Sequence, residues 1–194
     1  MFKEGDKKDA SNYRSISILP TLSKLLEKAV RTQLYAYLTE SNLILPNQFG
    51  FRLKSSTVTV ASHLSDQIRY SLDTGRLTGA VFLDLAKAFG TVNHTILLQK
   101  LGSLDVDDTA IARFTSFLTN RKQVTTEIAS VSIGVAQGSI LGPLLFIIYT
   151  SDLPDVLQFC QVTLYADDAV LYLASKSAAD LQRKINADLG RICK

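Results

Sequence analysis

The chain has 194 residues, enough for one sizeable domain or two small subdomains. Its hydrophobic fraction of 46% and charged fraction of 20% exclude a disordered chain, because such a composition can bury a core. The formal net charge of +3 is compatible with nucleic-acid binding but does not require it. The two cysteines, Cys160 and Cys193, form no CxxC pair, which argues against a structural zinc site.

The sequence predicts no membrane-spanning segment and no membrane partner. Its most apolar run, residues 140–149, is interrupted by Gly142 and Pro143. That run is about half of the roughly 20 residues that a transmembrane helix needs. The N-terminal residues are charged and lack the apolar core of a signal peptide. The abrupt start and end suggest a piece of a longer protein.

The first half of the chain predicts two helices and a strand. Residues 22–38 have apolar positions at helical spacing. A second helix is expected to start near Ser56 or Thr57 and to end at residues 73–75, where Gly75 stops it. Residues 80–85 predict a short strand, which contains one acid, Asp84.

The second half predicts helices at 94–101 and 108–118, with Asp108 as the N-cap of the latter. Residues 123–135 favour a strand or a hairpin, and a helix follows Gly142 and Pro143. A hairpin is expected over 162–173. The last helix begins at Ser177, because the segment from Ser177 to Asp180 resembles a capping box.

From residue 80 onward the expected order is strand, helices, strand, helix, hairpin, helix. This order lacks strict βαβ alternation, so it predicts an α+β fold with helices on one face of the sheet. The first eighty residues are mainly helical and could form a separate lobe. No linker divides the two parts.

Two adjacent acids, Asp167 and Asp168, stand inside the apolar hairpin run. One interpretation is a hairpin turn, since Asp favours turns. The other is a metal site with Asp84, the acid in the preceding apolar strand. Carboxylate oxygens suit Mg²⁺ or Mn²⁺, and two such ions about 4 Å apart serve in-line displacement at phosphorus. The residues alone therefore support a hypothesis of phosphoryl or nucleotidyl transfer.

Five segments resemble reverse transcriptase motifs, in the family's order and over nearly the whole chain. Residues 165–168 (YADD) resemble the YxDD box, residues 82–89 (FLDLAKAF) the first catalytic motif, and residues 134–146 (GVAQGSILGPLLF) the motif between them. Residues 12–17 (NYRSIS), and residues 48–52 (QFGFR) with Ser56 and Thr57, resemble the fingers motifs of LINE-type, non-LTR retrotransposons. One YADD is weak information, whereas five ordered motifs are specific.

The resemblance implies a right-hand polymerase with a palm built on a ferredoxin-like antiparallel sheet. Residues 1–79 would form the mainly helical fingers and residues 80–194 the palm, with part of 103–130 open to either region. The last palm strand and the thumb are expected to be absent, so the single reverse transcriptase domain would be incomplete at its C-terminal side. Asp84 and Asp167 would hold two Mg²⁺ or Mn²⁺ ions, with Asp168 in a supporting role.

The implied substrates are a dNTP, an RNA template and a DNA primer. Phe89 would lie under the sugar of the nucleotide and exclude a 2′-hydroxyl group; the alternative is a core aromatic residue. The other residues assigned by resemblance to the nucleotide or the template-primer are Arg14, Lys24, Arg52, Gln137, Gly138 and Tyr165. Plain solvation is the alternative for the cations, and a turn before a helix for Gly138.

Three positions depart from the usual family pattern, namely Ser15, Gly90 and Ala136. None of them removes an expected metal ligand. They leave open a second hypothesis, in which the chain is a catalytically inactive relic of such an element. An active polymerase of the group II intron or telomerase type is a further alternative, against which the fingers motifs argue. The resemblance implies work at chromosomal DNA in the nucleus, although the sequence shows no targeting segment.

Overall fold

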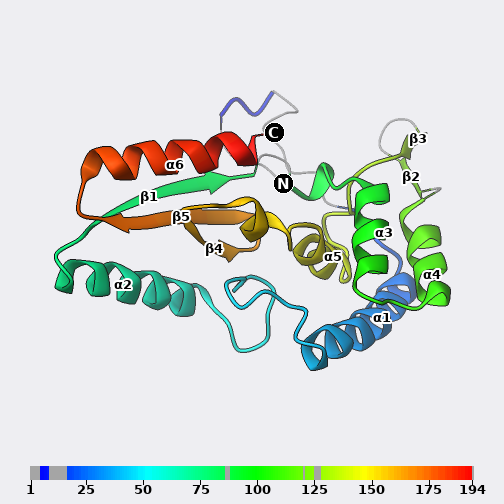
Figure 1. The fold of residues 1–194 in the computed structure, drawn as a ribbon. Helices are drawn as coiled ribbons and strands as arrows, with labels where there is room; N and C mark the ends of the chain where they lie inside the picture. The colour runs from blue at the N-terminus through cyan, green and yellow to red at the C-terminus, as the bar shows by residue number, and fades with distance from the viewer. Residues whose placement is uncertain (1–4, 9–16, 86–87, 120, 125–127, 194) are drawn as a thin grey trace. The chain divides into compact units, whose positions relative to one another are not determined.

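The computed structural model describes residues 5–8, 17–85, 88–119, 121–124 and 128–193. The chain divides into two compact units (Figure 1). The first unit comprises Met1–Ser41 and Lys87–Phe146, and the second comprises Asn42–Ala86 and Ile147–Lys194. The two units therefore interleave along the sequence. Within the described ranges, no helix combines the length and the apolar character that crossing a bilayer requires.

The first unit is mainly helical. It contains the helices α1 (Thr21–Glu40), α3 (His94–Ser103) and α4 (Asp108–Leu118), the 3₁₀ turn η2 (Ala88–Gly90) and the hairpin of β2 (Arg121–Val124) with β3 (Ile128–Val131). These elements confirm the predicted helices, and of the strand or hairpin expected over residues 123–135 the structure forms a hairpin. The helix α5 (Gly142–Tyr149), also predicted, begins in this unit and ends in the second.

The cap of α4 corrects the sequence prediction by one residue. The N-cap is Asp107, whose carboxylate accepts hydrogen bonds from the backbone amides of Thr109 and Ala110 at 2.8 and 3.3 Å. Asp108 is instead the first helical residue. Both aspartates suit a helix start, but the non-helical backbone of an N-cap is found at Asp107, where ψ is 141°.

The second unit is built on a three-stranded antiparallel sheet. Its strands are β1 (Leu77–Asp84), β4 (Gln161–Tyr165) and β5 (Asp168–Ser175), in the order β1-β5-β4. The helices α2 (Thr57–Asp73) and α6 (Ala178–Ile192) and the 3₁₀ turn η3 (Leu153–Val156) complete it. The predicted hairpin is thus β4 with β5, and β5 is the central strand.

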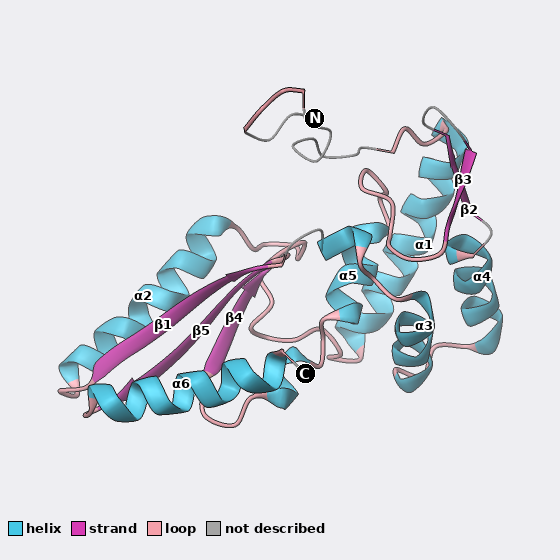
Figure 2. Ribbon diagram, turned by 90° about the horizontal axis from the view of Figure 1, so that it is seen from above, coloured by secondary structure: helices cyan, strands magenta, loops and turns pink. Residues whose placement is uncertain are grey.

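Helices lie on both sides of this sheet, so the prediction of helices on one face is wrong here. The helix α6 packs on β1 and β5, over a core that includes Leu164, Leu171, Leu181 and Ile185. The helix α2 lies on the other side of the strands (Figures 1 and 2). The reason is the hairpin's composition, because alternate residues such as Thr163 and Tyr172 are also buried.

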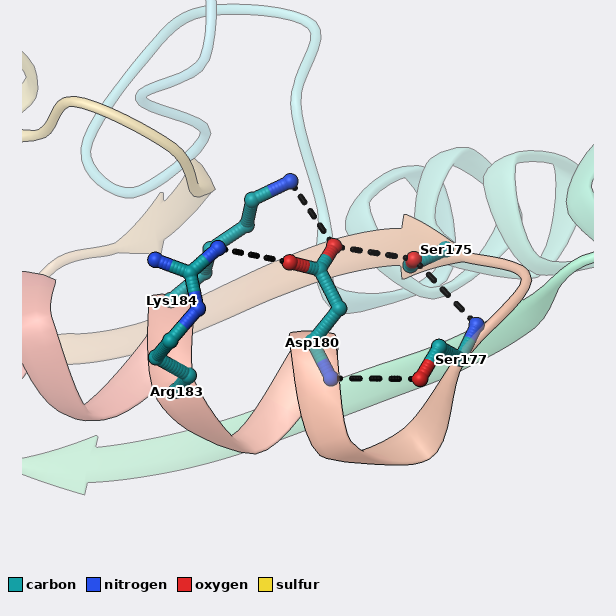
Figure 3. Close-up of polar contacts among 5 residues, drawn as sticks. All are labelled: Ser175, Ser177, Asp180, Arg183 and Lys184. Carbon is teal, nitrogen blue, oxygen red and sulfur yellow. Dashed lines mark hydrogen bonds and ion pairs between the residues drawn. The ribbon is translucent and has the colours of Figure 1, made fainter.

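The start of α6 confirms the predicted cap and adds a partner (Figure 3). Ser177 Oγ accepts a hydrogen bond from the Asp180 amide at 3.4 Å. In a capping box the acid would accept the amide of Ser177, but here Ser175 Oγ accepts it at 3.3 Å. Asp180 instead accepts from Ser175 Oγ at 3.0 Å and pairs with Arg183 and Lys184, each at 2.8 Å.

Candidate active site

The structure brings the three predicted acids to one end of the sheet of the second unit. Asp84 is the last residue of β1 and lies directly opposite Asp168, the first residue of β5. Directly opposed residues of an antiparallel pair present their side chains on the same face. Asp167 belongs to the two-residue turn that joins β4 to β5. The residue in register with Asp84 is therefore Asp168, for which the resemblance implies only a supporting role.

The neighbouring acids act on the carboxyl group of Asp168. Partial desolvation of the carboxyl group raises the pKa of Asp168, and the charges of Asp167 and Asp84 raise it further. Asp84 and Asp168 are nevertheless exposed, and Asp167 is half-buried. In the described part of the chain, no three His, Cys, Asp or Glu side chains are arranged to hold a metal ion. The acids form an exposed anionic cluster whose side chains are not gathered around one point.

The turn between the strands has an unusual backbone. Ala166 has a φ of 59°, a left-handed conformation. In primed hairpin turns a glycine usually fills a position of this kind, and an L-residue there costs about 1–2 kcal/mol. The structure confirms the turn interpretation for Asp167, whereas Asp168 already belongs to β5. The metal-site interpretation stays a prediction.

Three residues assigned to the nucleotide belong to the first unit. Phe89 is half-buried in η2, and its ring centroid lies 4.9 Å from that of Phe146. Gln137 is exposed, and its carbonyl oxygen accepts a hydrogen bond from the amide of Ser17 at 2.8 Å. Gly138 has a φ of 105°, a conformation that favours glycine. These contacts are structural, and they leave the nucleotide roles as predictions.

The predicted cationic and tyrosine contacts have different surroundings. Arg52 is half-buried, and its Nη1 donates hydrogen bonds to the carbonyl oxygens of Leu45, Gln48 and Pro46 at 2.9, 3.1 and 3.4 Å. Lys24 is exposed on α1. Tyr165 ends β4, where it pairs with Asp168. Arg14 lies outside the described residues.

Sequence reasoning missed Glu27, which anchors the segment after Gln137 and Gly138. This buried carboxylate accepts hydrogen bonds from Ser139 Oγ at 2.6 Å and from the amides of Ile140 and Leu141 at 2.7 and 3.2 Å. It thereby fixes the entry into α5. A signal was available in the sequence, because position 27 falls on the helical stripe of α1 that buries Leu34 and Leu38.

The antiparallel sheet of the second unit, flanked by helices, is consistent with a polymerase fold. The chain belongs to the family described as reverse transcriptase (RNA-dependent DNA polymerase), whose profile matches residues 5–191. The family assignment confirms the resemblance drawn from the five motifs.

The curated relatives are retrotransposon proteins of insects. The chain is 34% identical over 185 residues to a probable RNA-directed DNA polymerase from transposon BS of Drosophila melanogaster, which covers 89% of this chain and 20% of the relative. It is 33% identical over 153 residues to the RNA-directed DNA polymerase from mobile element jockey of Drosophila funebris. This alignment covers 76% of this chain and 17% of the relative. The chain thus spans about a fifth of the length of these relatives.

A solved structure supports the fold. The chain matches apo telomerase from Candida tropicalis, truncated from its C-terminal domain, with a TM-score of 0.58 and 13% identity. The match covers 87% of this chain and 37% of the telomerase chain. At this identity the likeness concerns the fold alone, and it agrees with an antiparallel sheet flanked by helices.

Proposed function

We propose that this chain is the part of a longer retrotransposon protein that carries RNA-directed DNA synthesis. The reaction would transfer a nucleotide from a dNTP to the 3′-hydroxyl of a DNA primer, directed by an RNA template. The observation that carries the proposal is the register that sets Asp84 opposite Asp168, beside the turn with Asp167. Family membership supplies the reaction type.

Asp84, Asp167 and Asp168 are the residues that would hold Mg²⁺ or Mn²⁺, two ions by family. Their chemistry fits, because hard divalent cations prefer carboxylate oxygens. A cation would also offset the charges of Asp167 and Asp84, which add to desolvation in raising the pKa of Asp168. When bound, such ions lower the pKa of an attacking hydroxyl and stabilise a leaving pyrophosphate. The carboxylates themselves would keep this end of the sheet anionic until cations bind.

In this proposal the antiparallel sheet of the second unit belongs to the polymerase palm, and α1 belongs to the fingers. The assignment of residues 1–79 to the fingers and 80–194 to the palm is a proposal on family grounds. The thumb would be supplied by sequence beyond the matched fifth of the relatives. Work at chromosomal DNA, in the nucleus, is likewise proposed from the family.

The nucleotide roles that the resemblance implies are proposed here for each residue by itself. Phe89 would exclude a 2′-hydroxyl group, with its ring supported by Phe146. The remaining proposed contacts to the dNTP or the template-primer are Arg14, Lys24, Arg52, Gln137, Gly138 and Tyr165. Arg52 has the least freedom for this role, because its guanidinium already holds three backbone carbonyl groups.

Primer extension on a primed RNA template tests the proposal directly. We expect Mg²⁺-dependent incorporation of dNTPs, and we expect Asp167→Asn to reduce it by about a thousandfold or more, as losses from a catalytic set do. If the chain is inactive but gains activity when downstream sequence is added, the function stands and the thumb is the missing part. If both forms are inactive, the chain is an inactive relic and the proposal fails.

A second assay tests the role of Phe89. Replacing Phe89 by Val removes the ring that would meet a 2′-hydroxyl group, so we expect incorporation of rNTPs to rise relative to dNTPs. Phe146→Leu is the matched control, because it changes the supporting ring and keeps the residue at position 89. Unchanged discrimination in Phe89→Val would remove Phe89 from the nucleotide site.

A further inference from the structure

A loop of the second unit lies along the edge of the hairpin that β4 and β5 form. Residues 45–52 run beside β4, on the edge that β5 does not occupy, with Gln48 and Leu164 forming a parallel bridge. The amide of Phe49 donates to the carbonyl oxygen of Leu164 at 2.8 Å, and the amide of Leu164 donates to that of Asn47 at 2.9 Å. The loop therefore acts as a short additional strand whose course ends at the turn.

The side chain of Gln48 reaches the turn itself. Its Oε1 accepts hydrogen bonds from the amide of Gly50 at 2.7 Å and from the amide of Ala166 at 3.2 Å. Gln48 is only 1% exposed, and its Nε2 has no hydrogen-bond partner among the described residues. Because two donors converge on one end of the amide, that end must be the oxygen. Gln48 is buried although its nitrogen has no partner among the described residues. We therefore take its oxygen, which accepts from the turn, to be the reason for a glutamine at this position.

Ala166 is the residue that needs such a restraint. Its left-handed φ of 59° is unfavourable for alanine, and strained backbone persists only where its surroundings hold it. Asp167 follows immediately and Asp168 comes next. A hydrogen bond to the Ala166 amide therefore acts on the backbone that carries two of the three acids.

Gly50 provides the close approach. A Cβ atom at position 50 would lie 2.0 Å from the amide nitrogen of Ala166 and 2.7 Å from its Cα. The neighbouring atoms are backbone, so they could not move aside without displacing the turn. Glycine is thus required at position 50 because the backbone of Ala166 lies too close for a Cβ atom, and any larger residue would separate the loop from the hairpin.

We propose that Gln48 and Gly50 position the catalytic turn, with the loop of residues 45–52 serving as its brace. Gln48 fixes the Ala166 amide, Gly50 permits the contact, and Arg52 holds the loop by binding the carbonyl oxygens of Leu45 and Gln48. The inference rests on the proposed polymerase function for its consequence, which is to set the orientation of Asp167 and Asp168. Its structural part can be measured without catalysis.

The test uses the whole 194-residue chain and two readouts. One is the hydrogen-exchange rate of the Ala166 amide by NMR, and the other is the affinity for Mn²⁺ measured by electron paramagnetic resonance. The variants are Gln48→Met, which keeps the shape and removes the acceptor, Gly50→Ala, which forces the loop away, and Gln48→Glu, which keeps an acceptor. Gly190→Ala in α6 is the control, because an added Cβ there meets nothing within 4 Å.

We expect Gln48→Met and Gly50→Ala to exchange the Ala166 amide at least about tenfold faster and to bind Mn²⁺ about tenfold more weakly, the scale on which residues that orient metal ligands act. Gln48→Glu should retain the protection of the amide, and Gly190→Ala should match the wild type. The inference is overturned if Ala166 exchanges at the wild-type rate in Gly50→Ala or in a folded Gln48→Met. If exchange responds but the wild type binds no Mn²⁺, the brace stands and the polymerase function fails.

Discussion

Aspartates lie near both ends of the strand β4, and the two groups have opposite electrostatic environments. Before its start, Asp188 of α6 is fully buried and accepts hydrogen bonds from the amides of Gln158, Phe159 and Cys160 at 3.0, 2.8 and 2.7 Å, with Arg191 at 2.5 Å. After its end, Asp168 lies opposite Asp84 and next to Asp167, and the negative charges of both act on its carboxyl group.

The pKa directions record this contrast. Burial alone would raise the pKa of Asp188, but the hydrogen bonds from the Cys160, Gln158 and Phe159 amides outweigh it and lower the pKa to about 2. At the hairpin turn, desolvation and neighbouring charges raise the pKa of Asp168. A compensated acid stabilises the fold, whereas an acid whose pKa is raised by neighbouring acids is a candidate for a functional site.

Removing the compensated acid should have the largest effect on stability. Asp188→Ala leaves three backbone amides and Arg191 without their acceptor, so we expect a loss of about 3–5 kcal/mol in the free energy of unfolding. Urea unfolding followed by circular dichroism measures it. Asn186→Ala, an exposed change in the same helix, is the control and should stay near the wild type. A loss below about 1 kcal/mol for Asp188→Ala would contradict the account.

Acid should reproduce part of that loss. The pKa of Asp188 is about 2 in the folded chain, against about 3.9 in an unfolded one. The lowered pKa of Asp188 therefore contributes about 2–3 kcal/mol to the free energy of unfolding above about pH 4, and this contribution is lost as the pH falls toward 2. Urea midpoints between pH 6 and pH 2.5 measure this. The urea midpoint should depend less on pH in Asp188→Asn than in the wild type. An equal pH dependence in both would assign the acid sensitivity to other groups.

The cap of α6 should contribute less. Ser177→Ala removes the acceptor of the Asp180 amide, whose hydrogen bond is long at 3.4 Å, so we expect a loss of about 0.5–1 kcal/mol. Thermal unfolding can resolve it. Ser177→Asp, which restores an acceptor at the N-cap, should recover stability. Equal melting temperatures for the wild type and Ser177→Ala would show that Ser175 and Asp180 hold the helix start without Ser177.

The smallest effect, of opposite sign, is expected at the turn. Asp168→Asn removes one of three like charges, so stability at neutral pH should rise by about 0.5 kcal/mol while primer extension falls. Because the pKa of Asp168 is raised, its ionised form is unfavourable in the folded chain, and the gain should vanish as the pH falls. A clear destabilisation at neutral pH would place Asp168 among the structural acids instead.

The sequence predicted the elements well, because each depends on local periodicity and caps. The stripe of Leu181 and Ile185 predicted α6, and the β-prone run around the two acids predicted the hairpin. Asp84 was predicted as the third acid from its position in an apolar strand. Its exact partner was not predictable, because the register that selects Asp168 depends on pairing between segments over eighty residues apart.

Contacts made through backbone groups escaped the sequence. The loop of residues 45–52 pairs with β4 through amides and carbonyls, which leave no periodic pattern. The contacts of the Arg52 guanidinium with carbonyl groups of its own loop were likewise not predictable, and its proposed contact with the dNTP or the template-primer stays a prediction. Glu27 and Asp188 sit on buried helical stripes, so an acid on an apolar face was the signal that could have found both.

Calorimetric titration of Mn²⁺ tests most directly whether the uncompensated acids form the cation site. The wild type, Asp84→Asn and Asp180→Asn are compared at neutral pH, since Asp180 is already paired with Arg183 and Lys184. We predict at least about tenfold weaker binding for Asp84→Asn and unchanged binding for Asp180→Asn. Equal affinity in the wild type and Asp84→Asn would contradict the account.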